Sequence, residues 1–167
     1  MFENSKKLTT SKIALYGMFM ALTTVSTMII SIPSIATQGY INLGDAFVIL
    51  SGLVLGPFGG LVVGGIGSAL ADILLGYAYY APYTLIIKGL EGLIGVSIYR
   101  KVLKEKFLLP PVVVAGLFMA LGYLVVEIFL YGYPAAIASL PGNIVQGLVG
   151  ALISSIIYKA IKTKIKF

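Results

Sequence analysis

The sequence predicts an all-α integral membrane protein: a bundle of six transmembrane helices with both termini in the cytoplasm. Of its 167 residues, 59% are apolar and only 11% are charged, too few charges to cover a soluble domain of this length. The mean hydropathy is +1.02. The apolar stretches reach the roughly 20 residues that a membrane-spanning helix needs. The basic residues, finally, gather at the ends of those stretches.

The apolar stretches define six helices within a single membrane domain, 1–167. We expect them at 12–32, 45–57, 59–76, 82–99, 111–132 and 142–161. The first ends at Pro33, and a polar, turn-rich segment follows it. A single helix over 45–76 would be about 48 Å long, well beyond a ~30 Å hydrocarbon core, so the turn at Gly56-Pro57 divides it. The segments 77–82 and 133–141 are expected to be loops.

Eleven of the twelve basic residues form three clusters, and these orient the bundle. The clusters are Lys6, Lys7 and Lys12; Arg100, Lys101, Lys104 and Lys106; and Lys159, Lys162, Lys164 and Lys166. Cytoplasmic loops of membrane proteins carry an excess of lysine and arginine. Six crossings place all three clusters in the cytoplasm, whereas five would leave the last one outside. The net charge of +6 therefore sets topology and does not indicate nucleic-acid binding. No cleaved signal peptide is expected.

The absence of cysteine and histidine narrows the possible chemistry. The chain has neither residue, which excludes disulfides, thiolate catalysis and the usual zinc ligands. It also removes the side chain that most often carries protons near neutral pH. We therefore expect no metal, no cofactor in this chain and no enzymatic activity.

Small residues recur at helical spacing in two of the expected helices. Gly60, Gly64 and Ser68 follow one another at every fourth position, and a similar series begins at Gly147. Such faces let helices approach closely in lipid, where no hydrophobic force drives association. Close helix packing is the simplest explanation of most of these residues.

Apart from the basic clusters at the span ends, the strongly polar residues within the expected spans all fall in the outer half of the membrane. They are Asp45, Asp72, Lys88, Glu91, Glu127, Asn143 and Gln146. A charge inside a bilayer costs about 2.5–3.5 kcal/mol on the mildest scale, so it usually faces a cavity or a partner. The inner half has no such group, although a channel or self-sufficient carrier needs a polar route across the whole membrane. The pattern predicts an outward-facing pocket that depends on a partner protein for release.

Each charged residue also has a purely structural explanation. Lys88 and Glu91 are three residues apart and could neutralise each other. Asp45 could cap the second helix, and Asp72 could join two helices. Glu127 has no partner in its own helix, so it needs a ligand or a partner from another helix, where Lys88 is the sole intramembrane cation.

The amides and tyrosines of the outer half have two explanations as well. Asn143 and Gln146 could be ordinary interfacial residues, and the many tyrosines near 77–83 and 131–133 could be an aromatic belt. Together, however, these groups suit a flat, hydrogen-bonding molecule, with rings that stack on it and amides and carboxylates that read its polar edge. The expected binding residues are Asn42, Asp45, Tyr80, Tyr83, Lys88, Glu91, Glu127, Asn143 and Gln146.

The segment 39–95 contains three motifs that together resemble a known family. They are GYINLGDA, LADILLGYA and YAPYTLIIKGLEG. The chain resembles the substrate-binding S components of energy-coupling factor (ECF) vitamin transporters, in particular the subgroup for riboflavin, hydroxymethylpyrimidine and pyridoxine. The resemblance implies a six-helix protein of the bacterial plasma membrane with an outward-facing vitamin site.

The resemblance also implies partners. In this family a membrane scaffold subunit and two ATP-binding subunits drive transport, and a small-xxx-small motif on the first helix contacts the scaffold. The corresponding positions here are Ala14, Gly17 and Ala21, with Gly17 in place of one of the family's usual two alanines. The chain has no GxxxxGK[ST] motif, so ATP hydrolysis is expected in the partners.

The sequence thus predicts a vitamin-capture subunit. Pyridoxine or hydroxymethylpyrimidine is the favoured ligand, and riboflavin is the next candidate. Three alternatives stay open at this point. They are a stand-alone secondary carrier of a small metabolite, a structural membrane subunit without a ligand, and a membrane enzyme that uses Asp72 or Glu127 as acid and base.

Overall fold

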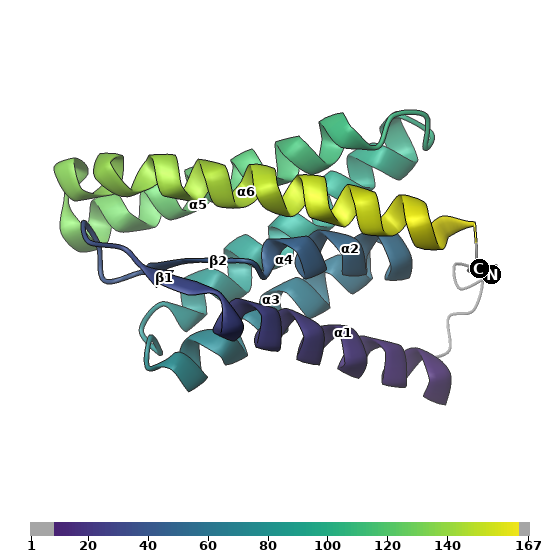
Figure 1. Ribbon diagram of the computed structural model, residues 1–167, viewed down its shortest axis with the longest axis horizontal. Helices are drawn as coiled ribbons and strands as arrows, with labels where there is room; N and C mark the ends of the chain where they lie inside the picture. Colours follow the sequence, from purple (N-terminus) through teal and green to yellow (C-terminus); the bar gives the residue numbers. More distant parts are fainter. Residues whose placement is uncertain (1–8, 164–167) are drawn as a thin grey trace.

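A computed structural model describes residues 9–163, which form a bundle of six α-helices and a short β-hairpin (Figure 1). Lys6, Lys7, Lys164 and Lys166 of the basic clusters lie outside the described residues. The elements are α1 (Thr10–Ile29), β1 (Ser31–Pro33), β2 (Tyr40–Asn42), α2 (Asp45–Leu55), α3 (Pro57–Leu75), α4 (Ala81–Ser97), the π-helix η1 (Ile98–Val102), α5 (Leu109–Tyr131) and α6 (Tyr133–Lys162).

Within the described residues, five helical segments are long and apolar enough to cross a membrane. They are α1, α3, α4 with η1, α5 and α6. The sixth helix, α2, has only 11 residues and spans about 16 Å. Large apolar side chains such as Ile29 and Phe129 are strongly exposed on the outside of the bundle, as expected where lipid is the solvent.

The short helix α2 lies at the centre of the bundle. Nine of its 11 residues are buried; it packs against α3 and α4 on one side and α6 on the other. In Figure 1 α5 and α6 form one layer, α1 and α3 lie on the opposite side, and α2 runs between them. This position explains why α2 is apolar around its whole circumference, as a fully buried helix is.

Glycines set the closest helix approaches. A Cβ atom on Gly60 of α3 would lie 2.5 Å from the Gly92 carbonyl oxygen of α4, and the reverse substitution meets the same obstacle. Gly116 of α5 and Gly147 of α6 face each other in the same way. The small-residue faces expected from the sequence therefore do bring backbones into contact, as in other membrane helix pairs.

The bundle has two different ends. We call the end with the β-hairpin, the α3–α4 loop and the α5–α6 junction at Gly132 the hairpin end, seen on the left in Figure 1. The opposite end, where α1 begins, η1 turns into the loop 103–108 and α6 ends, is the basic end. It carries Lys12, the 100–106 cluster and the described lysines of α6.

Two expected boundaries were wrong. The segment 133–141 is not a loop, because α6 begins at Tyr133 and contains Pro141. Proline is tolerated in membrane helices, where neighbouring groups compensate for the missing hydrogen bond. The first helix ends at Ile29 instead of residue 32, because Ser31–Pro33 forms β1 and pairs with β2 in antiparallel register, Ile32 opposite Ile41.

Candidate functional site

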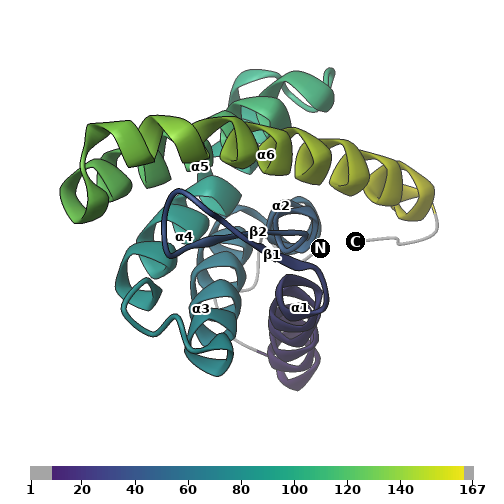
Figure 2. The same cartoon turned by 60° about the vertical axis from the view of Figure 1, so that its left-hand side comes forward.

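A cavity of about 310 Å³ opens beneath the hairpin. Every α-helix except α2 contributes to its wall: Thr27 from α1, Asp72 from α3, Lys88 from α4, Glu127 from α5 and Gln146 from α6. The hairpin, including the loop 34–39 between its strands, covers the cavity from the hairpin end (Figure 2). The cavity is covered because the segment after α1 forms this hairpin and folds back over the ends of the helices.

The floor of the cavity is an ion-pair cluster centred on Lys88. Its ammonium group pairs with the Asp45 carboxylate of α2 and, at 3.3 Å, with the Glu91 carboxylate one turn along α4. All three side chains are buried, Lys88 being 2% exposed. Gln146 donates to Asp45 at 3.0 Å and accepts from the Asn42 backbone N–H at 2.8 Å. Buried charges persist in structures when they are paired in this way.

The cluster decides between the explanations offered by the sequence for its members. Lys88 and Glu91 do pair within α4, but Asp45 from α2 is a second partner. Asp45 does not act as a cap: the N-cap of α2 is Gly44, and no side-chain capping bond is present there. Only Lys88 and Gln146 of this cluster line the cavity, while Asp45 and Glu91 lie behind them.

Glu127 is held by hydroxyl groups. Thr37 in the loop after β1 donates to one carboxylate oxygen at 3.2 Å, and Ser139 of α6 donates to the other. Among residues 9–163 Glu127 forms no ion pair, so Lys88 is not its partner. The cross-helix partner expected from the sequence is therefore a serine on α6, together with a threonine above the cavity.

Asp72 joins α3 to the hairpin. The Tyr40 hydroxyl of β2 donates to Asp72 Oδ1 at 2.6 Å, and both residues line the cavity. The Thr84 hydroxyl of α4 lies close to the same carboxylate, but its hydrogen bond is with the Tyr123 hydroxyl of α5, at 2.9 Å.

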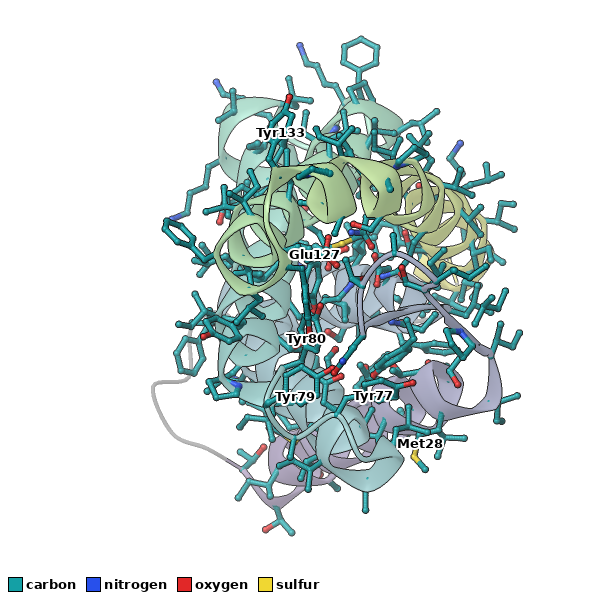
Figure 3. All side chains as sticks on the ribbon, turned by 90° about the vertical axis from the view of Figure 1, so that its left-hand side faces the viewer. Met28, Tyr77, Tyr79, Tyr80, Glu127 and Tyr133 are labelled. Carbon is teal, nitrogen blue, oxygen red and sulfur yellow. The ribbon has the colours of Figure 1, made fainter. Side chains whose placement is uncertain are left out.

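The tyrosines divide into two groups. Tyr40, Tyr80 and Tyr123 line the cavity, and the rings of Tyr80 and Tyr123 are 6.4 Å apart at 58°. Tyr83 does not line the cavity and is 39% exposed. In the end-on view of Figure 3, Tyr80 and Glu127 lie near the middle of the hairpin end and Tyr133 lies at the periphery. The cavity-wall and aromatic-belt explanations thus each account for part of the set.

Six of the nine expected binding residues line the cavity. They are Asn42, Tyr80, Lys88, Glu127, Asn143 and Gln146. The structure does not bring Asp45, Glu91 or Tyr83 to its surface. Asp45 and Glu91 instead hold the cavity-lining Lys88 in place.

Sequence reasoning missed several wall residues that periodicity could have found. Tyr40 is two residues from Asn42, so both fall on one face of β2. Tyr123 is four residues before Glu127 on α5, and Thr84 is four before Lys88 on α4, so each shares a helix face with an expected residue. Helical and strand periodicity around the charged residues is the signal that identifies them.

Below the floor, toward the basic end, the bundle is filled by apolar side chains. The core includes Ile49 and Leu53 of α2, Val96 of α4 and Ala151 of α6. Ser154 and Ser155 are buried there as well, but each bonds a carbonyl of its own helix. Within residues 9–163 no group of three or more histidine, cysteine, aspartate or glutamate side chains is placed to hold a metal ion.

Comparison with known proteins agrees with this architecture. The chain matches the family described as "ECF-type riboflavin transporter, S component" over residues 7–163. It is 32% identical over 157 residues to the thiamine precursor transporter HmpT of Lactococcus lactis, covering 93% of this chain and 87% of that protein. It is also 41% identical over 136 residues to an uncharacterized protein of Pyrococcus woesei, covering 78% and 87% respectively.

These matches confirm the resemblance read from the motifs in 39–95. The family is described as a transporter component and HmpT as a transporter, which agrees with five apolar helices long enough to span a bilayer. The chain is a multi-pass membrane protein and belongs to the family of ECF-type riboflavin transporter S components.

Proposed function

We propose that this protein is the substrate-capture subunit of an ECF-type ATP-driven vitamin importer. It binds a small heteroaromatic vitamin or vitamin precursor at the hairpin end, which faces the outside of the cell, and releases it after docking with the energising subunits. The observation that carries the proposal is the cavity beneath the hairpin: it has polar and aromatic walls, an ion-pair floor and an apolar core below.

Hydroxymethylpyrimidine or pyridoxine is the preferred ligand, and riboflavin is the next candidate. The relative HmpT is described as a thiamine precursor transporter, which supports a pyrimidine. The cavity of about 310 Å³ lies at the lower end of the ~300–1,000 Å³ range of ligand pockets. This size favours a single-ring ligand over the three fused rings of riboflavin.

The orientation follows from the charges. Seven of the basic residues lie at the basic end within the described chain: Lys12, Arg100, Lys101, Lys104, Lys106, Lys159 and Lys162. The positive-inside rule places this end in the cytoplasm, so both termini are cytoplasmic and the cavity faces outward. The chain then crosses the bacterial plasma membrane six times, with α2 as the short crossing between the hairpin and α3.

Transport requires partners, and α1 provides a surface for one. Ala14, Gly17 and Ala21 are exposed on α1, and a Cβ atom on Gly17 would meet nothing within 4 Å. A face of small residues suits a closely packed transmembrane partner. We assign it to the membrane scaffold subunit of an ECF module, whose two ATP-binding subunits supply the energy.

Two measurements test the function. Mass spectrometry of the small molecules that copurify with the protein should identify a heteroaromatic vitamin or precursor, and calorimetry with hydroxymethylpyrimidine, pyridoxine and riboflavin should rank them. Uptake into proteoliposomes should require the scaffold, the ATP-binding subunits and ATP. Uptake without these subunits would identify a secondary carrier, and the absence of any bound or binding vitamin would indicate a structural subunit.

A further inference from the structure

Among residues 9–163, the cavity wall contains one carboxylate oxygen that is buried and has no hydrogen-bond partner. Asp72 is 3% exposed and lines the cavity. Its Oδ1 accepts from Tyr40, but its Oδ2 has no hydrogen-bond partner among the described residues. Leaving a buried acceptor unsatisfied is costly, more so for a charged group, and such a group in a binding cavity calls for a donor from the ligand.

The other acidic residues near the cavity differ from Asp72. Asp45 and Glu91 also have unpartnered oxygens, but they lie behind Lys88 and do not reach the cavity surface. Glu127 lines the cavity, but both of its oxygens accept from hydroxyl groups. Asp72 is therefore the wall carboxylate with capacity for one more donor, and Lys88 is already engaged by two carboxylates.

A complementary group comes from α6. Asn143 of α6 is 8% exposed and lines the cavity, and its Nδ2 has no hydrogen-bond partner in the described chain. Figures 1 and 2 both place α3 and α6 on opposite sides of the bundle. An amide can offer either a donor or an acceptor, whereas an ionised carboxylate accepts only. A ligand between them must present a donor toward Asp72.

We infer that Asp72 is the specificity-determining residue of the site and selects a heteroaromatic ligand with an exocyclic amino group at the edge facing α3, with its other polar edge toward Asn143. The inference rests on the proposed capture function and names its ligand class. A ring with a carbonyl oxygen at that edge would bring two acceptors together, which binding sites reject strongly. The carboxylate also favours a neutral or cationic ring over an anionic one.

The test uses two pyrimidines that differ at one position. They are 4-amino-5-hydroxymethyl-2-methylpyrimidine and its 4-oxo analogue, which carries a carbonyl in place of the amino group. Calorimetry on the purified wild-type protein should show at least about tenfold tighter binding of the amino compound. Asp72→Asn should weaken binding of the amino compound by about 10–100-fold. It should also shrink or reverse the preference, because an amide can donate to the carbonyl.

The readout is the ratio of the two affinities, which a general loss of folding would not invert. Glu105→Gln makes the same carboxylate-to-amide change at the basic end, far from the cavity, and should leave the ratio at its wild-type value. Asn143→Asp should lower binding of both compounds while keeping the amino preference, provided its melting temperature is close to that of wild type.

The outcomes separate this inference from the proposed function. An unchanged ratio in Asp72→Asn, or wild-type preference for the 4-oxo compound, would overturn the role of Asp72 while capture stands. Binding of riboflavin or pyridoxine with no binding of either pyrimidine would overturn the ligand class alone. If the wild-type protein binds none of the four compounds, the capture function itself fails for these vitamins and the inference falls with it.

Discussion

Lys88 and Lys162 have similar partners at opposite ends of the bundle, yet their surroundings differ completely. Lys88 pairs with Asp45 and Glu91 and lies 5.7 Å from the centre of the Tyr123 ring. Lys162 pairs with Glu105 and lies 5.7 and 5.6 Å from two tyrosine rings. Lys88 is 2% exposed and Lys162 is 45% exposed.

The difference shows how each end of the bundle uses charge. At the hairpin end the charges are dehydrated and depend on one another, so removing one leaves others unpaired. At the basic end water and ions screen the same kind of pair. Polar groups therefore form the candidate binding site at the hairpin end. At the basic end they set the orientation of the protein in the membrane, and the apolar core supplies the packing. Four substitutions test this contrast, in order of decreasing expected effect.

Lys88→Met should have the largest effect. It leaves the Asp45 and Glu91 carboxylates buried without their cation. Removing one partner of a buried ion pair lowers the free energy of unfolding by about 3–5 kcal/mol. We expect a large fall in the melting temperature in detergent and loss of measurable vitamin binding. Lys101→Met, at an exposed lysine of η1, is the matched control and should change neither.

A second substitution checks the cause of that loss. Adding Asp45→Asn to Lys88→Met removes one of the two unpaired carboxylates and should restore part of the melting temperature, without restoring binding. If Lys88→Met alone binds the vitamin with wild-type affinity, the ion-pair cluster is not the floor of the site.

Leu53→Ala should separate stability from binding. Leu53 is buried in the apolar core toward the basic end, and truncating a buried leucine costs about 2–5 kcal/mol. The melting temperature should fall, while the affinity measured at low temperature should stay within about threefold of wild type, roughly 0.6 kcal/mol. Leu152→Ala, at a residue 54% exposed on α6, is the control. An equal loss of affinity at low temperature would show that the core below the floor shapes the site.

Gly17→Leu should affect transport alone. The position is exposed and open, so the larger side chain fits the isolated protein and should leave melting temperature and binding unchanged. It should block close approach of a partner helix and lower ATP-driven uptake by the full complex at least about tenfold, equivalent to about 1.4 kcal/mol. Leu22→Ala, which shortens an exposed side chain of α1, is the control. Normal uptake by Gly17→Leu would remove this face from docking.

Much of the fold could be predicted from the sequence because lipid imposes simple constraints. Long apolar stretches can satisfy their backbones only as helices, and Gly56-Pro57 marked the turn between α2 and α3 correctly. The prediction of a loop at 133–141 was wrong. It relied on Pro141, because proline breaks helices in water, whereas α6 continues through this residue. The hairpin was missed because each of its strands has three residues, too few to show alternation.

The charged residues of the candidate site could be predicted from the sequence, whereas most of its uncharged residues could not. A buried lysine or glutamate within a span is conspicuous, so Lys88 and Glu127 could be assigned to the region from sequence alone. The sequence did not distinguish Tyr80 from Tyr83: Tyr80 precedes α4 and lines the cavity, whereas Tyr83 does not line it and is partly exposed. The role of Asp72 depends on Tyr40, 32 residues away, a contact that only the folded hairpin creates.

Lys162→Ala should have the smallest effect. An exposed ion pair contributes about 0–1 kcal/mol and a cation–π contact at an exposed site about 0.5–1 kcal/mol, so we expect a fall of at most a few degrees in the melting temperature, with vitamin binding unchanged. Lys159→Ala is the control, since among residues 9–163 Lys159 forms no ion pair. Because salt screens exposed charges, the Lys162→Ala effect should shrink in high salt, whereas that of Lys88→Met should persist. Equal salt dependence at the two lysines would show that water reaches the cluster beneath the cavity, and the contrast between the two ends would fail.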